Sequence, residues 1–325
     1  MNIEKKIQSF FKERRRFGLF IAATNILWPF IVMMPQGFAS RVIRRKHKAV
    51  FNYLSSVCEG ENSHQNLQEE ATGKESFADS PIWVCWLQGE DTMPMLCKKC
   101  LESLRKHSGS HPVIVITAAN YSNYCDIPEY IVSKYQEGII RPAHFADIIR
   151  TCLLYEQGGL WIDATVFVTR DLPEEIFNSR YYSIKFPSIG YYVTECKWSN
   201  YCLAAHPHSA WYAFIRKVFF IYLKKEDLFV DYFLMDYIMK WCYDENDMVR
   251  KEVDEIPVNN SSALSLTKVL SEPIDDSVRQ MIHGDTYLFK LSWRKTPNDE
   301  TKELKTVWSY LNSYSLNFNP QNHDK

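Results

Sequence analysis

Short apolar runs alternate with amphipathic segments in the middle of the chain. The runs 82–89 (IWVCWLQG) and 111–120 (HPVIVITAAN) are typical of buried strands, because apolar, aromatic and β-branched residues follow one another without a polar face. Segments 94–107 and 143–159 instead place apolar residues on one side of a helix, and the second ends at two glycines. The run 160–168 (LWIDATVFV) predicts a third strand. This alternation predicts an α/β domain with a largely parallel sheet.

The rest of the chain divides where this pattern changes. Past Pro207, apolar positions repeat at helical spacing in two stretches that break near Glu226, which predicts a helical insertion in the domain. Residues 59–80 are polar and acidic with few apolar anchors, so they predict a flexible linker. We therefore expect three parts, namely a helical region at 1–58, the linker at 59–80 and the α/β domain at 81–325.

The N-terminal region differs from the rest of the chain in charge. Residues 1–48 hold eleven Lys and Arg against two Glu, a net charge of +9, whereas the remaining residues hold 27 Lys and Arg against 37 Asp and Glu, a net charge of −10. Between Arg16 and Arg41 there is no charged residue. A basic region with a long apolar stretch predicts binding to an anionic membrane surface, where each Lys or Arg adds about 1 kcal/mol.

The uncharged stretch at 17–40 allows more than one placement. It is long enough to span a bilayer, but Thr24, Asn25, Pro29 and Pro35 interrupt it and both flanks are basic. We favour a segment that lies on or dips into the inner face of the plasma membrane. The protein is then expected to be cytoplasmic, and peripheral or monotopic on that membrane. The alternative is a helix packed against the main domain.

The overall composition argues against two classes of protein. The net charge of −1 gives no electrostatic support for general nucleic-acid binding. The nine cysteines are irregularly spaced, and several lie in apolar segments. This pattern favours reduced thiols in a cytosolic protein over a framework of disulfide bonds.

Polar residues stand where the predicted strands end. In an open α/β sheet, ligands bind beyond the carboxyl ends of the strands. Gln88 and Asn120 follow the first two strands, and Asp163 is expected where the third strand emerges. Asp147 and Arg150 are three residues apart on the helix before the third strand, so they share a helical face. We expect one crevice built from Trp86, Gln88, Asn120, Asp147, Arg150 and Asp163.

The chain resembles the capsular polysaccharide synthesis protein family in four ordered segments. These are 82–89, 142–172 (PAHFADIIRTCLLYEQGGLWIDATVFVTRDL), 231–238 (DYFLMDYI) and 287–295 (YLFKLSWRK). That family is similar to glycosyltransferases with a DXD motif, which include the yeast initiating mannosyltransferases and the clostridial glucosylating toxins. The resemblance implies a GT-A type fold that binds a nucleotide-sugar donor.

The resemblance also implies roles for individual residues. Trp86 matches the tryptophan that stacks on the donor base, Asp147 and Arg150 match residues that contact the donor sugar, and Asp163 matches the first Asp of the DXD motif. Asp147, Arg150 and Asp163 are the expected catalytic residues. The expected donor-binding residues are Trp86, Gln88, Asn120, Asp147, Arg150, Asp163, Thr165, Lys290, Ser292 and Trp293. Asp231 and Asp236 either face the acceptor or lie in solvent on an amphipathic helix.

Thr165 departs from the DXD motif. It stands where the second Asp of the wider superfamily binds a divalent ion, and a hydroxyl is a poorer ligand than a carboxylate for Mn²⁺ or Mg²⁺. Two alternatives follow. Either Asp163 holds the ion with water and phosphate, with His283 as a further candidate ligand, or basic groups near Lys290 neutralise the diphosphate instead.

These features predict a retaining glycosyltransferase at the inner face of the plasma membrane. It would move a sugar from a nucleotide-sugar donor to a lipid-linked polysaccharide intermediate in capsule or exopolysaccharide synthesis. One alternative is a non-catalytic carbohydrate-binding or assembly protein of the same fold, which donor turnover with and without Mn²⁺ would separate. The other is a transferase that acts on protein, which the basic apolar N-terminal region disfavours. The donor base, the sugar, the acceptor, the linkage and the oligomeric state are left undetermined.

Overall fold

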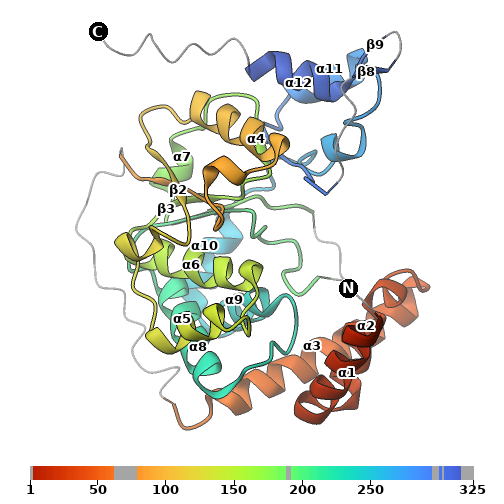
Figure 1. The fold of residues 1–325 in the computed structure, drawn as a ribbon, viewed down its shortest axis with the longest axis vertical. Coiled ribbons are helices and arrows are strands. Elements are labelled where there is room, and N and C mark those ends of the chain that lie inside the picture. Colours follow the sequence, from red (N-terminus) through yellow and green to blue (C-terminus); the bar gives the residue numbers. More distant parts are fainter. Residues whose placement is uncertain (1–2, 62–78, 188–191, 295–299, 302–303, 316–325) are drawn as a thin grey trace.

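A five-stranded sheet forms the centre of the computed structural model, which describes residues 3–61, 79–187, 192–294, 300–301 and 304–315 (Figure 1). The strand order is β2-β1-β3-β6-β5. Strands β2 and β3 run parallel to β1, and β6 lies antiparallel between β3 and β5. The prediction of a mixed α/β domain with a mostly parallel sheet is therefore confirmed. The strands are β1 (Ile82–Cys85), β2 (Val113–Ile116), β3 (Gly159–Ile162), β5 (Tyr181–Ser183) and β6 (Cys202–Ala205).

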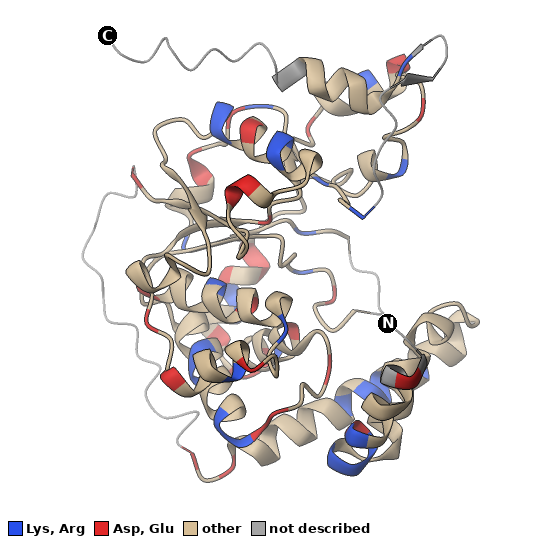
Figure 2. Ribbon diagram, viewed as in Figure 1, with Lys and Arg blue, Asp and Glu red and all other residues tan. Residues whose placement is uncertain are grey.

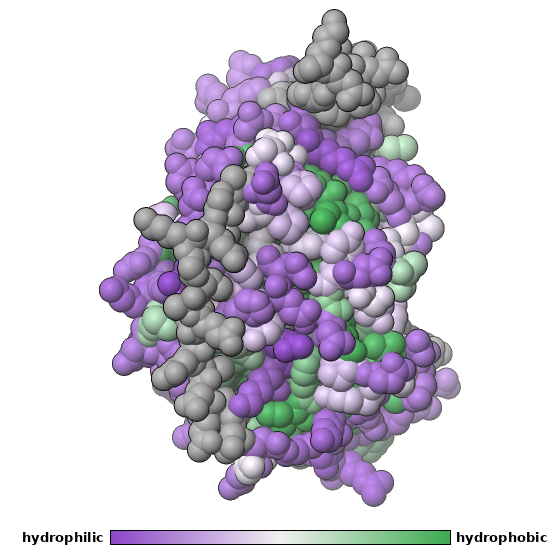
Figure 3. All heavy atoms as spheres, turned by 90° about the vertical axis from the view of Figure 1, so that its left-hand side faces the viewer, coloured by the Kyte–Doolittle hydropathy of each residue, from purple (hydrophilic) through white to green (hydrophobic). Residues whose placement is uncertain are grey.

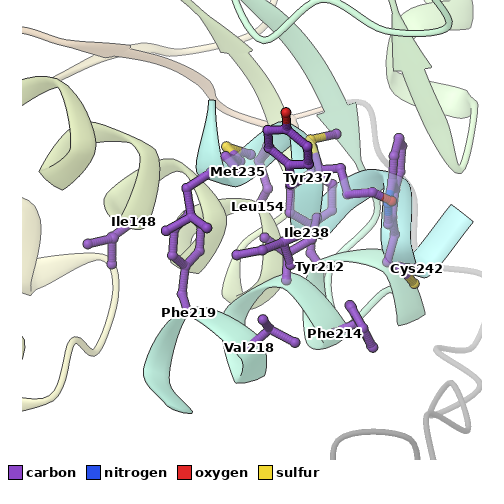
Figure 4. Close-up of a cluster of buried hydrophobic side chains, with 14 of the residues drawn as sticks. Ile148, Leu154, Tyr212, Phe214, Val218, Phe219, Met235, Tyr237, Ile238 and Cys242 are labelled. Carbon is purple, nitrogen blue, oxygen red and sulfur yellow. The ribbon is translucent and has the colours of Figure 1, made fainter. Parts of the chain in front are cut away.

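Helices cover both faces of the sheet, which explains why the strands are apolar throughout. Trp83 and Trp161 belong to one buried cluster with α6 (Pro142–Glu156), α8 (Ala210–Lys225) and α9 (Leu234–Glu245). Figure 4 shows how side chains of these three helices pack together. The alternate residues Ile82, Leu160 and Ile162 belong to a second cluster with α4 (Met95–Lys106) and α7 (Glu175–Asn178). Successive strand residues point to opposite faces, so both faces must be apolar.

The helices α8 and α9 form the two helical stretches that the sequence predicts past Pro207. The first ends at Lys225 and the second begins at Leu234, so the break lies next to Glu226 as expected. Two smaller helices pack on this part of the domain, namely α5 (Glu129–Gln136) against α8 and α10 (Asp247–Glu255) against α9. Another, α11 (Asp276–His283), belongs to a separate buried cluster with α4. The 3-10 turns that connect elements are η1 (Glu90–Thr92), η2 (Tyr121–Asn123) and η3 (Leu266–Lys268).

The prediction of one continuous strand over 160–168 is wrong. The chain turns after Ile162, and β4 (Val166–Val168) joins a separate two-stranded sheet with β7 (Leu288–Lys290). The residues between the two strands close a tight turn, in which the Val166 N–H donates to the Asp163 carbonyl at 2.9 Å. The apolar pattern could not reveal this turn, because both β3 and β4 are buried. Farther on, β8 (Glu300–Thr301) pairs with β9 (Leu304–Lys305), followed by α12 (Val307–Ser315).

The two glycines before β3 are required by the backbone and by the space around them. Gly158 and Gly159 have φ angles of +65° and +87°, which residues with a side chain rarely adopt. A Cβ on Gly159 would lie 2.3 Å from the Pro81 carbonyl, and one on Gly158 would lie 2.7 Å from Pro207 Cδ. The pair therefore ends α6 and brings β3 close enough to pair with β1.

The N-terminal helices pack on the main domain through α3 (Gln36–Cys58). Its buried residues Val50 and Leu54 join the cluster around α6, α8 and α9. An ion pair between Lys46 and Asp231, with nitrogen and oxygen 2.5 Å apart, is buried in this interface. Arg16, at the end of α1 (Ile3–Phe17), pairs with the buried Glu226. The region at 1–58 is thus helical as expected, and it is attached to the domain. Most of the predicted linker, residues 62–78, lies outside the described residues.

Exposed apolar side chains are concentrated on α1, on α2 (Leu19–Ile31) and on the turn into α3. Met33 is 82% exposed, which is unusual for an apolar residue in a folded chain. Lys and Arg lie on α1 and α3 around this surface (Figure 2). The opposite side of the molecule is mainly hydrophilic, with separate small apolar patches (Figure 3). The exposed apolar residues of this region are Ile7, Phe11, Leu19, Phe20, Ile26, Leu27, Phe30, Val32, Met33, Met34 and Phe38.

Within the described part of the chain, no helix combines the length and the apolar character that a membrane crossing needs. The stretch 17–40 is divided between α2, a turn and the start of α3. One side of α2 is buried, including Ile21 and Ala22, while Leu19 and Phe30 are exposed. The described cysteines are all free, in agreement with the expectation of reduced thiols.

Candidate functional site

Asp163 lies in the corner between β3 and β4, at the carboxyl end of β3. Its backbone N–H donates to the Tyr201 carbonyl at 3.0 Å, so the backbone is fixed before the chain turns. β1 and β3 pair in parallel with Trp83 opposite Trp161, and the same register places Cys85 level with Asp163. Trp86 therefore follows β1 at the edge where Asp163 leaves β3, as the sequence predicts for a ligand site.

The carboxylate of Asp163 is held on both oxygens. Lys290 Nζ lies 2.6 Å from Oδ2, and the Trp161 indole N–H donates to Oδ1 at 2.9 Å. Arg150 is 3.8 Å from Oδ1. Lys290 also donates to Thr165 Oγ1 at 2.7 Å, so one ammonium group binds both polar residues of the Asp-Ala-Thr segment. The side chain of Asp163 is one-third exposed, so this cluster is open on one side.

Arg150 connects Asp163 to α6 and to the turn before β6. Its guanidinium donates to the Asp147 carboxylate one helical turn earlier and to the carbonyl of Asn200. It also lies over the Trp161 ring, 5.1 Å from the ring centre. The expected helical pair of Asp147 and Arg150 is therefore present, and it lies next to Asp163. We call the group of Asp147, Arg150, Asp163, Thr165 and Lys290 the Asp163 site.

Burial and the two cations shift the pKa values of the carboxyl groups of this region in opposite directions. Burial opposes ionisation of Asp163, but Lys290 and Arg150 more than offset it and hold the pKa of this carboxyl below its usual value. Burial raises the pKa of Asp147 to about 6, although Arg150 opposes the shift. Burial likewise raises the pKa of Asp236 to about 7. Carboxyl groups with separated pKa values are common where a protein binds or transfers charge.

Two tryptophans meet beside the strand ends. The rings of Trp86 and Trp293 pack edge to face with centres 6.0 Å apart, and Trp293 is 48% exposed. The Trp86 indole N–H donates to Thr92 Oγ1 at 3.1 Å, which fixes its ring orientation. Gln88 is exposed in the turn that follows, and Ser292 is half-buried beside Trp293. Segments 200 residues apart in the chain thus form one aromatic surface.

Several residues expected at the site have other partners. Asn120 shapes its own turn, because its amide group bonds to the backbone of Thr117 and Val115. Asp231 is buried in the ion pair with Lys46, and its other oxygen accepts the Phe233 N–H at 2.8 Å. The expected acceptor role of Asp231 has no support in this geometry, and neither does a solvated position.

Asp236 is buried on α9 and does not face solvent. It accepts a hydrogen bond from the Trp198 indole at 3.0 Å. Burial chiefly raises its pKa, and the nearby charge of Asp147 adds to this shift while Arg150 opposes it. The expectation that it lies on a solvated face is wrong, and its expected acceptor role stays a prediction.

Three residues of the site carry no obvious signal in the sequence. Trp161 binds Asp163 and Arg150, Asn200 supplies a carbonyl to Arg150, and the Tyr201 ring lies 5.4 Å from Lys290 Nζ. Trp161 could have been found, because it stands two positions before Asp163 and alternate strand residues share a face. Asn200 and Tyr201 could not, because their positions depend on how β6 pairs with β3.

The described side chains do not fit a bound divalent ion. A hard cation needs several oxygen ligands, and Lys290 already occupies the space between Asp163 and Thr165. Among the residues that the structure describes, no three His, Cys, Asp or Glu side chains converge to hold an ion. His283, the other expected ligand, lies on α11 with its Nε2 atom 3.1 Å from the Tyr310 hydroxyl. The described structure therefore gives no support to the expected metal role of His283 or Asp163.

Comparison with known proteins identifies the family. The family model of the capsular polysaccharide synthesis protein matches residues 32–311, which include α3, the sheet and the Asp163 site. The chain belongs to this family. It is also 26% identical over 110 residues to O-glycosyltransferase braB of Annulohypoxylon truncatum. That match covers 31% of this chain and 26% of the relative. No solved structure matches the chain.

The match to the family confirms the resemblance that the four ordered segments predict. It also extends that resemblance to α3, which the motifs did not cover, whereas α1 and α2 precede the matched residues. The chain matches about a quarter of this relative's own length.

Proposed function

We propose that this protein is a GT-A type glycosyltransferase that moves a sugar from a nucleotide-sugar donor to a lipid-linked saccharide. The observation that supports it most is the Asp163 site, where a carboxylate at a strand end is held by Lys290, Arg150 and Trp161. The site lies at the carboxyl ends of parallel strands, where α/β proteins bind ligands. Membership of the capsular polysaccharide synthesis protein family agrees with this reaction.

Each part of the site has a role in the proposed reaction. Trp86 and Trp293 bind the donor base, Asp163 and Asp147 accept hydrogen bonds from sugar hydroxyls, and Lys290 faces the diphosphate. The bond from the anomeric carbon to the phosphate oxygen breaks, and its electron pair passes to the diphosphate. The acceptor oxygen bonds to the same carbon, and its proton passes to the leaving diphosphate. Lys290 stabilises the charge that develops on the diphosphate.

With attack from the leaving-group side, the configuration at the anomeric carbon is retained. No carboxylate then has to act as a nucleophile or as a strong base. This suits Asp163, because Lys290, Arg150 and Trp161 keep it ionised and hydrogen-bonded. The anomeric configuration of the product, measured by NMR, distinguishes retention from inversion.

We expect Trp86→Ala to weaken donor binding by about 1–3 kcal/mol, which is the usual effect of removing an aromatic ring from a base. UDP- and GDP-sugars are first screened by thermal unfolding, where a donor at 100 times its Kd should stabilise the fold by about 2.7 kcal/mol. The affinity of Trp86→Ala for the best donor is then measured by calorimetry. Phe11→Ala, which removes an exposed aromatic ring from α1, is the matched control.

If Trp86→Ala lowers the unfolding temperature but leaves the affinity for the donor unchanged, the role of Trp86 is packing alone. A screen in which no nucleotide sugar binds or turns over would contradict the proposed function itself. In that case the non-catalytic alternative, a carbohydrate-binding protein of this fold, would be favoured.

The membrane is the proposed surface for the acceptor, because the N-terminal helices combine exposed apolar side chains with exposed Lys and Arg. Phe30, Met33 and Phe38 are 57–82% exposed, and Arg44 and Arg45 lie nearby on α3. A cavity of about 410 Å³ lies between these helices and the main domain. Its lining includes His144, which is one turn before Asp147 on α6, but none of the five residues of the Asp163 site.

We expect Phe30→Ser/Met33→Ser/Phe38→Ser to reduce binding to vesicles of phosphatidylglycerol and phosphatidylcholine by at least about tenfold, because buried apolar groups contribute about 0.8 kcal/mol per CH₂. Cosedimentation measures the bound fraction. The matched control, Met248→Ser/Val258→Ser/Leu264→Ser, changes exposed apolar residues elsewhere. Equal binding of both triple variants would contradict the membrane surface. Point substitutions are needed, because deletion of residues 1–48 would remove Lys46 from the buried Asp231.

A further inference from the structure

We propose that the ammonium group of Lys290 is the resident cation of the donor site, so that the chain binds the donor diphosphate without a divalent metal ion. The proposal rests on the proposed function, because it assigns a partner to the diphosphate of a nucleotide sugar. It resolves the two alternatives that Thr165 leaves open in the sequence. Three observations support it: the fixed backbone of Lys290, its contacts, and the charges around it.

The backbone of Lys290 is held on both sides. β7 pairs with β4 so that Lys290 lies opposite Val166, one residue after Thr165. The Lys290 N–H donates to the Ala263 carbonyl at 2.9 Å, and the Leu291 N–H donates to the Thr165 carbonyl at 2.8 Å. Lys290 is therefore positioned by the same small sheet that positions Thr165. A surface lysine on a free loop would not be placed in this way.

The side chain of Lys290 fills the position between the two polar residues of the Asp-Ala-Thr segment. Its Nζ atom is 2.6 Å from Asp163 Oδ2 and 2.7 Å from Thr165 Oγ1. A divalent ion held by the same two residues would have to occupy this space. The ammonium group has three N–H donors, and these two contacts use two of them. Among the described residues no hydrogen bond uses the third, and the side chain is 26% exposed, so a ligand can reach it.

The charges around Lys290 disfavour a second cation. Arg150, which also pairs with Asp147, lies 3.8 Å from the other oxygen of Asp163, so the Asp163 carboxylate already faces two positive groups. A divalent ion beside Asp163 would be repelled by both. A diphosphate would be attracted by both, and Lys290 could donate to it without losing Asp163. Asp163 is then a positioning residue for Lys290 as well as a partner of sugar hydroxyls.

This assignment changes the expectation for Thr165→Asp. Because Thr165 stands at the position of the second Asp of the DXD motif, adding a carboxylate there would be expected to tighten Mn²⁺ binding. In the structure the new carboxylate would lie beside Lys290 and pair with it. A metal site should appear only when Lys290 is removed as well.

The test measures Mn²⁺ binding directly, by calorimetry and by the electron paramagnetic resonance signal of free Mn²⁺. Wild type, Thr165→Asp and Lys290→Met should each bind Mn²⁺ with a Kd weaker than about 1 mM, since none offers two free carboxylates. The double variant Thr165→Asp/Lys290→Met should bind Mn²⁺ at least about tenfold more tightly than either single variant. Lys251→Met, on the exposed face of α10, is the control for loss of one lysine.

The second arm measures binding of UDP and GDP in EDTA and in Mn²⁺. Whichever binds to wild type should bind equally well in both, and Lys290→Met should weaken it at least about tenfold, because a charge-assisted hydrogen bond is lost. Mn²⁺ should not restore binding to Lys290→Met. Tight binding of one Mn²⁺ to wild type, or to Thr165→Asp alone, would overturn the proposal. So would nucleotide binding that requires Mn²⁺.

The two proposals fail in different ways. If neither nucleotide nor any nucleotide sugar binds to wild type, the donor role is lost together with the proposed function. In that case, Mn²⁺ binding to wild type, to the two single variants and to the double variant still tests whether Lys290 is the resident cation. If donor binding requires Mn²⁺, the proposed function stands and the role of Lys290 falls.

Discussion

Asp163→Asn should lower the rate of glycosyl transfer by at least about 10²- to 10³-fold, the usual loss when one preorganised electrostatic group is removed from an active site. The carboxylate binds Lys290 and Trp161 and lies 3.8 Å from Arg150. An asparagine oxygen can still accept the Trp161 N–H, but its neutral amide cannot hold the ammonium group. Lys290 would then lose the partner that fixes its position toward the diphosphate.

The fold should tolerate this substitution. The backbone bonds that close the corner, from the Asp163 N–H to Tyr201 and from the Val166 N–H to Asp163, do not involve the side chain. Asp171→Asn is the matched control, because Asp171 is 84% exposed and bonds only to His107 among the described contacts. Transfer is measured as release of nucleoside diphosphate, and stability is measured by urea unfolding. Full transfer activity in Asp163→Asn would contradict the glycosyltransferase assignment.

Arg150→Ala should abolish transfer and also lower the free energy of unfolding by about 3–5 kcal/mol, because one partner of a buried ion pair is removed. The sequence alone predicts loss of activity with an intact fold. In the structure Arg150 is 4% exposed, pairs with Asp147 and donates to the Asn200 carbonyl. Its removal leaves the half-buried Asp147 carboxyl without its cation, although partial burial already raises the pKa of this group to about 6. Low activity in this variant would therefore be ambiguous.

A double variant separates the two effects. Asp147→Asn/Arg150→Met removes both charges while keeping similar side-chain volumes, so most of the lost stability should return. If Arg150 contacts the donor sugar, as proposed, transfer should remain absent in this stable chain. Urea unfolding and the transfer rate are measured on the single and double variants. Recovery of transfer together with stability would limit Arg150 and Asp147 to a structural role.

The sequence determined the order of the main elements because their signals are local. Apolar runs of strand length, helical spacing in 143–159 and the two glycines after it predict β1, α6 and β3. The glycines are needed at φ angles of +65° and +87°, with backbone atoms too close for a side chain. The pairing of Asp147 with Arg150 also followed from spacing, because residues three apart share a helical face.

Only the tertiary structure decided what surrounds Asp163. The turn at Asp163 divides an apolar run that looks continuous in the sequence, because β3 and β4 are both buried although they belong to different sheets. Lys290 reaches Asp163 from 127 residues away, through the pairing of β7 with β4. The burial of Asp231 likewise depends on its ion pair with Lys46, which belongs to the N-terminal region. Local patterns determine which segments become strands and helices, whereas long-range strand pairing and helix packing determine which charged groups meet.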